Sequence, residues 1–316
     1  MRIFRFEKWF VDVLTADRDY MIVFYTITEV FGFKICFVEV NIGSFEDTGS
    51  SGGFYLNQKL HLLKRENHTL SVREGDILLE AGLGKMKLSL REIDLELDFN
   101  PVHHSDFDNP GMGIPKTGRT SICWKPLFLK TLVSGKIKMH GDKRQILGNG
   151  YVDYLISARI PFNMPVRQLY WGRLHSQDCD LTYSLTIDKN NAVTGYQMIL
   201  KFKGNHMQFD TLDIQPGEWE MYDPPGISFP TGYTLEAFDD RYRIKMKITH
   251  TKPAIVSEFV ENTSELGWLR LALLKKISKN PRGIKFFSNA SLEIIFDGQT
   301  TNLDDLILID EYVKFT

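Results

Sequence analysis

A period-two alternation of apolar and charged residues is the feature that most constrains how this chain can fold. It is cleanest at 93–99, where isoleucine, leucine and phenylalanine alternate with acidic residues. Successive side chains of a strand point to opposite faces, so the pattern predicts a strand with one buried face and one face in water. The same pattern recurs at 135–139, 243–248 and 291–296. Both halves of the chain are therefore predicted to be rich in strands.

Turn-forming residues separate these segments at short intervals, which is typical of antiparallel sandwiches and barrels. They occur at 67–68, 74–76, 141–142, 190–191, 223–226 and 297–298. One segment instead predicts a helix: Thr263 or Ser264 can cap it, leucines follow at helical spacing, and Asn280-Pro281 ends it. The predicted fold class is all-β and mainly antiparallel, with one accessory helix.

The length of the chain predicts two domains. Its 316 residues exceed the roughly 100 to 200 residues of a usual domain. Hydrophobic residues make up 43% and charged residues 25%, an ordinary globular composition. We expect an N-terminal domain at 1–177 and a C-terminal domain at 178–316.

Charge and cysteine content exclude several classes of partner and cofactor. Lysine and arginine number 38 and acidic residues 40, so there is no basic excess to bind nucleic acid. The three cysteines, Cys36, Cys123 and Cys179, show neither metal-ligand spacing nor a disulfide framework. The N-terminus lacks the features of a secretory signal. We expect a cytoplasmic protein without a metal or another cofactor.

Two segments, 148–154 and 169–175, gather polar and aromatic residues within predicted strands. Residues two apart on a strand share a face. The side chains brought together in this way on each strand are Tyr151 and Asp153, and Trp171, Arg173 and His175. Gly148 and Gly150 predict a tight turn or the close approach of another strand. These segments are the candidate functional site.

With a glycine-flanked Tyr-x-Asp at 151–153 and Trp-Gly-Arg at 171–173, the chain resembles the carotenoid 1,2-hydratases. The same group includes AttH-like lipocalin-like proteins and fungal decalin-forming Diels-Alderases. Further likeness lies at Glu7–Phe10, Ile93–Pro101 and Gly135–Gly150, and it weakens beyond Tyr183. The resemblance implies two lipocalin-like β domains, barrel or sandwich, with a long apolar isoprenoid or polyene ligand at the domain junction.

The resemblance also implies cofactor-independent hydration, isomerisation or cyclisation, with Asp153 as the catalytic acid. Burial would raise the pKa of Asp153, and aromatic faces would stabilise a developing carbocation. The substrate-binding residues implied are Tyr151, Tyr154, Trp171, Arg173, His175 and Trp9. The family pattern reads Tyr-His-Asp-His, whereas Val152 and Tyr154 stand at the two histidine positions here. This departure puts hydration specifically in question.

Other interpretations of the same residues stay open. Arg173 can hold Asp153 ionised in a structural pair, and His175 can be a satisfied structural histidine. The chain can then be a non-catalytic carrier of an apolar small molecule. A third reading is a docking surface for a protein or the periphery of a membrane, because 22 phenylalanines and 5 tryptophans are present. Histidines and aspartates at 103–108 are more typical of a solvated loop than of a metal site.

Overall fold

The computed structural model describes fourteen stretches of the chain, in which every regular element is a β-strand and every strand pairing is antiparallel. The stretches are 4–30, 33–44, 56–59, 63–66, 69–74, 77–81, 84–90, 93–104, 122–139, 141–157, 166–209, 211–223, 226–258 and 281–315. The predicted all-β, antiparallel class is confirmed. The helix predicted between Thr263 and Asn280 lies outside the described residues. Within them, no helix is long and apolar enough to cross a membrane.

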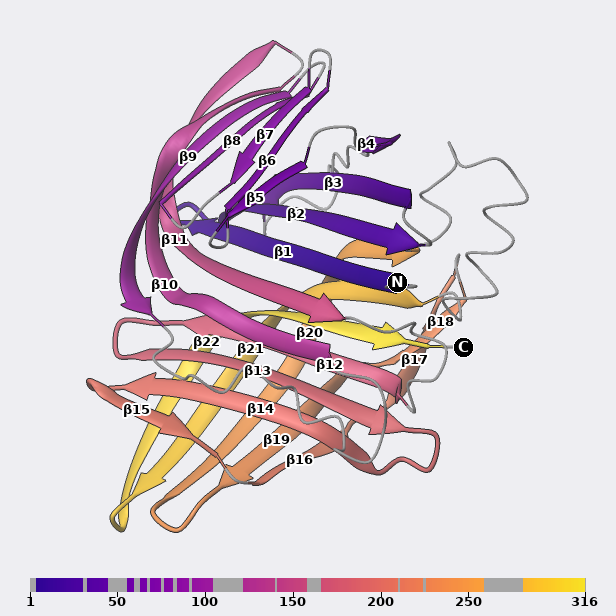
Figure 1. Cartoon of the computed structure of the whole chain (residues 1–316). Coiled ribbons are helices and arrows are strands. Elements are labelled where there is room, and N and C mark those ends of the chain that lie inside the picture. The colour runs from indigo at the N-terminus through magenta and orange to yellow at the C-terminus, as the bar shows by residue number, and fades with distance from the viewer. Residues whose placement is uncertain are drawn as a thin grey trace. The chain divides into compact units, whose positions relative to one another are not determined.

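The first unit is an eleven-stranded sheet with the order β4-β3-β2-β1-β11-β10-β9-β8-β7-β6-β5. Figure 1 shows β9 and β10 curving strongly along their length. The strands are β1 (Phe4–Thr15), β2 (Asp19–Val30), β3 (Phe33–Ser44), β4 (Leu56–Lys59), β5 (Leu63–Glu66), β6 (Thr69–Glu74), β7 (Ile77–Ala81), β8 (Lys85–Leu90), β9 (Ile93–His104), β10 (Ile122–Met139) and β11 (Asp142–Ser157).

The second unit is a nine-stranded sheet with the order β15-β14-β13-β12-β22-β21-β20-β19-β16, and β17 and β18 form a separate two-stranded ribbon. The strands are β12 (Val166–His175), β13 (Cys179–Asp188), β14 (Val193–Phe202), β15 (Asn205–Gln208), β16 (Thr211–Pro216), β17 (Trp219–Tyr222), β18 (Ile227–Pro230), β19 (Gly232–Phe238), β20 (Tyr242–Glu258), β21 (Arg282–Phe296) and β22 (Gln299–Lys314).

The chain separates into two compact units. The stretch Ile160–Thr316 belongs to the second unit. A division at residue 177 would separate β12 from β13, which pair with each other from Val166 to His175. The turn that follows His175 therefore joins two neighbouring strands of one sheet.

The alternation at 93–99 has the predicted consequence in β9. Ile93, Leu95 and Leu97 are at most 1% exposed, while the acidic residues between them face outward. On that outer face Glu96 binds Lys136 Nζ at 2.7 Å and Lys87 Nζ at 3.0 Å. The hydrogen bond from Lys136, which is the largest cause, and the one from Lys87 lower the pKa of Glu96 to about 2. Alternation thus separates a dry face from a charged one.

The central strands of both units differ from β9 because both of their faces are buried. In β1, Trp9, Val11 and Val13 belong to the hydrophobic core of the first unit. Phe10 and Asp12, which point the other way, are only 3% and 0% exposed. We call these two sides of β1 and its neighbour β11 the core face and the acid face. A buried second face places polar groups away from water, where they need partners.

Close strand packing explains the glycine at position 150. A Cβ on Gly150 would lie 2.6 Å from Val133 Cγ2 and 2.8 Å from the Asp12 carbonyl oxygen. Real side-chain atoms do not approach so closely, and the second contact is to backbone. The close approach predicted for this glycine is confirmed.

We therefore expect Gly150→Ala to destabilise the protein by about 1 to 3 kcal/mol, because a crowded core must shift to admit the methyl group. Urea unfolding measures the change. Gly84→Ala is the matched control, since a Cβ there has nothing within 4 Å. Equal midpoints for the two variants would contradict the packing argument.

Candidate functional site

Asp153 lies on the acid face of β11, opposite Phe10 of β1. Its side chain is buried, and the residue is only 5% exposed. Trp124 of β10 donates a hydrogen bond from Nε1 to Asp153 Oδ2 at 2.9 Å. An indole N–H is a donor only, so this bond fixes the carboxyl without deciding whether it holds a proton.

The surroundings of Asp153 shift its proton affinity strongly. Burial is the largest cause and raises the pKa to about 7, from an ordinary value of 3.8. Hydrogen bonds from Trp124 and Tyr151 and the charge of Lys8 oppose this rise, whereas the Asp12 carboxylate adds to it. Near neutral pH, Asp153 can therefore both donate and accept a proton, which a general acid requires.

Aromatic and cationic side chains accompany Asp153 on the acid face. The strand register places Asp12 opposite Tyr151, and the rings of Phe10 and Tyr151 meet edge to face with centroids 6.3 Å apart. Lys8 Nζ lies 5.8 Å from the Phe10 ring centroid and closer still, 4.9 Å, to that of a second phenylalanine. Lys8 thus interacts with the faces of two phenylalanine rings on this side of the sheet.

Two predicted site residues, Trp9 and Tyr154, lie on the core face instead. Trp9 stacks on Tyr25 with ring centroids 4.9 Å apart, and it contacts Tyr154 at 4.7 Å. Both belong to or pack against the hydrophobic core of the first unit. Adjacent residues of a strand face opposite ways, so Tyr154 is separated from Asp153 by the sheet. Of the predicted aromatics, Tyr151 is the one beside the acid in this unit.

The remaining predicted residues share one face of β12 in the second unit. Trp171 and Arg173 are 6% and 1% exposed, and His175 Nδ1 lies 3.0 Å from Asp180 Oδ1. Nearby, Lys285 forms an ion pair with Glu311 and lies 6.0 Å from the Trp171 ring. This face of β12 is rich in charged groups.

The His175 contact with Asp180 favours the structural interpretation of this histidine. Arg173 belongs to the second unit and Asp153 to the first. Pairing between them, like the ligand pocket expected at the domain junction, stays a prediction.

A buried polar cluster of the second unit was missed by the sequence analysis. Asp310 of β22 accepts hydrogen bonds from Tyr233 at 3.0 Å and from Ser288 at 2.6 Å, and Tyr233 is itself bonded to Tyr183. Burial, followed by the charge of Asp310, raises the pKa of both tyrosines well above the ordinary range. Its members come from four strands far apart in sequence, so no local motif could have revealed them.

His250 joins this cluster through both ring nitrogens. Nδ1 lies 2.7 Å from the Pro230 carbonyl oxygen, and Nε2 lies 2.8 Å from Asp310 Oδ2. A carbonyl can only accept, so the contact with Pro230 is a hydrogen bond when Nδ1 carries the hydrogen. The ring also stacks on Phe286 at 3.9 Å. His250 thus connects Pro230, the last residue of β18, to the buried cluster around Asp310.

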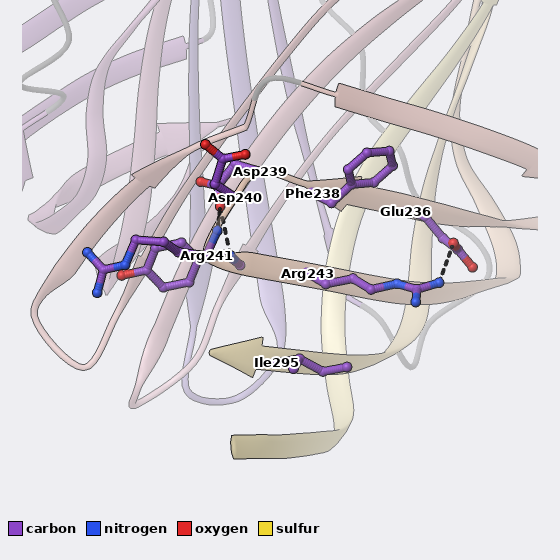
Figure 2. A pocket seen from close by; sticks show the side chains of 8 residues that line it. Glu236, Phe238, Asp239, Asp240, Arg241, Arg243 and Ile295 are labelled. Carbon is purple, nitrogen blue, oxygen red and sulfur yellow. Dashed lines mark hydrogen bonds and ion pairs between the residues drawn. The ribbon is translucent and has the colours of Figure 1, made fainter. Parts of the chain in front are cut away.

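A surface depression of about 450 Å³ lies at the β19–β20 turn (Figure 2). Its lining residues are Glu236, Phe238, Asp239, Asp240, Arg241, Tyr242, Arg243 and Ile295. Asp239 accepts hydrogen bonds from the backbone of the turn, and Arg243 pairs with Glu236 at 3.3 Å. These charged groups stabilise the hairpin, and the depression contains none of the predicted site residues.

Solved structures with the same fold include three described proteins. An AttH-assigned protein from Nitrosomonas europaea has a TM-score of 0.68 and 13% identity, covering 99% of this chain and 93% of its own. CghA, also solved with Sch210972, has a TM-score of 0.70 and 10% identity, covering 99% of this chain and 88% of its own. Kievitone hydratase from Nectria haematococca has a TM-score of 0.59 and 11% identity, covering 98% of this chain and 89% of its own. No family model and no curated protein matches the sequence.

These likenesses confirm the AttH-like, lipocalin-type fold that the sequence resemblance implied. At this level of identity they establish the fold, whereas activity depends on particular side chains.

The raised pKa of Asp153 has a measurable effect on stability. The folded state binds the proton more tightly than the unfolded chain, so the stabilising effect is complete below about pH 4 and is lost as pH rises through about 7. The loss is on the order of 4 kcal/mol. We expect Asp153→Asn to remove this pH dependence and to melt at or above the wild-type temperature at pH 8.

Thermal melting between pH 4 and pH 8 measures this difference, and Asp98→Asn on an exposed position is the control. A large fall in the melting temperature of Asp153→Asn at pH 8 would instead identify Asp153 as an ionised structural group.

Proposed function

We propose that this chain is an enzyme that binds a long, largely apolar small molecule, of isoprenoid or polyene type. It promotes hydration, isomerisation or cyclisation of that molecule without a redox cofactor. Asp153 is the acid, Tyr151 and Phe10 provide aromatic faces beside it, and Trp124 orients the carboxyl. The observation that carries the proposal is the buried Asp153 carboxyl, whose pKa of about 7 leaves it partly protonated at neutral pH.

The chemistry requires a proton donor in a dry, aromatic environment. Protonating a double bond creates a carbocation, which water would capture without control in an open site. Burial of Asp153 excludes water and retains the proton, while ring quadrupoles stabilise the positive charge. The residues of the acid face thus supply each element of the proposed reaction from the chain itself.

The comparisons support a catalytic role in general terms. One protein of this fold is a hydratase by name, and another has been solved with a small molecule. Val152 and Tyr154, which replace the histidines of the family pattern, face away from Asp153. Their replacement alters the core face and leaves the acid face intact, so it weighs less against catalysis than the sequence suggested.

We expect wild-type protein to add water to at least one member of a panel of geranylgeraniol, lycopene and α-parinaric acid, or to isomerise or cyclise it. Mass spectrometry of reactions in H₂¹⁸O separates hydration from the other two outcomes. Asp153→Asn should lower turnover by about 10² to 10⁴-fold, the usual contribution of a general acid.

Saturable binding of fluorescent α-parinaric acid without turnover would identify a carrier. Absence of both would leave the docking-surface interpretation. His175→Gln is the matched control, because His175 has a structural partner in Asp180 and should retain most of the turnover.

A further inference from the structure

Four side chains form a compact quartet on the acid face. Phe10 pairs with Asp153, and Asp12 pairs with Tyr151, in the antiparallel register of β1 and β11. Directly opposed residues share a face, as do residues two apart on one strand. The two carboxyl groups therefore occupy one diagonal of the quartet and the two rings the other. All four residues are at most 5% exposed.

The register makes Asp12 and Asp153 diagonal neighbours on one buried face. Diagonal neighbours of an antiparallel pair are about 7 to 8 Å apart at the backbone. The Phe10 and Tyr151 rings, with centroids 6.3 Å apart, occupy the other diagonal of the quartet. After burial, the charge of Asp12 is a further cause of the raised Asp153 pKa, so the two carboxyls are electrostatically coupled.

We propose that Asp12 is a second catalytic carboxylate, the proton acceptor that works with Asp153 across the Phe10–Tyr151 ring pair. This inference rests on the proposed function of Asp153 as the acid. It adds what the acid alone does not supply, a base that activates water or removes a proton from the cation.

The proton and electron balance of hydration is complete with these two groups. Asp153 donates its proton to one alkene carbon, and the π electrons form the new C–H bond. The oxygen of water bonds to the adjacent cationic carbon, and Asp12 accepts the proton that this water loses. Transfer of that proton to Asp153 restores the starting state, so the net reaction is addition of one water. If Asp12 takes a proton from carbon instead, the product is an isomer.

Other groups on the acid face define the charge balance. Lys8 is the cation whose charge acts on Asp153, and Trp124 and Tyr151 donate hydrogen bonds to it. Further along the face, Glu39 accepts a hydrogen bond from Asn41 at 2.7 Å. With Asp153 protonated, Lys8 and Asp12 bear opposite charges beside it. One proton on the pair therefore leaves the nearest groups electrically balanced.

Infrared titration tests the coupling without any substrate. The protonated-carboxyl band that Asp153→Asn removes should titrate near pH 7 in wild type. In Asp12→Asn the midpoint of this band should fall, because a like charge has been removed. Glu7→Gln is the matched control, since Glu7 is also buried on β1 but points to the core face. An unchanged midpoint in Asp12→Asn would overturn the inference.

Turnover measurements then distinguish a catalytic base at Asp12 from a carboxylate that only interacts electrostatically with Asp153. With the panel compound that wild type converts, Asp12→Asn should lower kcat by about 10² to 10⁴-fold and remove the low-pH limb of the rate profile. Asp12→Glu keeps a carboxylate, so it should retain part of the turnover and part of the low-pH limb. It tests the inference even if Asp12→Asn folds poorly. If Asp153→Asn abolishes turnover but Asp12→Asn and Asp12→Glu keep the wild-type rate and profile, the inference fails alone. If wild type converts no compound, the proposed function fails, and this inference fails with it.

Discussion

Burial of both faces of the central strands is the constraint on which the rest of the structure depends. A sheet with one wet face leaves alternate polar side chains in water without cost. At 9–13 of β1, 150–153 of β11, 170–174 of β12 and 179–187 of β13 those alternate positions are dry, so each polar group there needs a partner. Thr182 bonds the Gly172 carbonyl at 3.1 Å and His175 contacts Asp180 for this reason. Gly150 reflects the same close packing.

The same burial couples stability to chemistry at Asp153. Removing the carboxyl from water costs free energy whenever it is ionised, and the protein responds by holding the proton to about pH 7. A group that is unfavourable for folding at neutral pH is well suited to act as an acid there. In the second unit, Asp310 is also buried, but it accepts hydrogen bonds from Tyr233 and Ser288 and contacts His250 Nε2, so its burial organises a core.

Proteins that share this fold at 9 to 13% identity retain the architecture with almost wholly different side chains. Such divergence is possible because the sheet depends on alternation and on backbone pairing, which many sequences satisfy. Chemistry depends instead on a few positions of one face. On β11 the acid position lies on the acid face, while the two departures from the family pattern lie on the other side.

The sequence by itself determined the strand-rich, antiparallel fold and the sharing of a face by Tyr151 and Asp153, because a period of two is local. Tertiary structure alone decided which face is buried, where the units divide, and that Trp9 and Tyr154 lie behind the sheet from Asp153. It also decided the partners Trp124 and Asp12 and the Asp310 cluster. These depend on register between strands up to 151 residues apart along β1 and β11, and no local pattern encodes register at that distance.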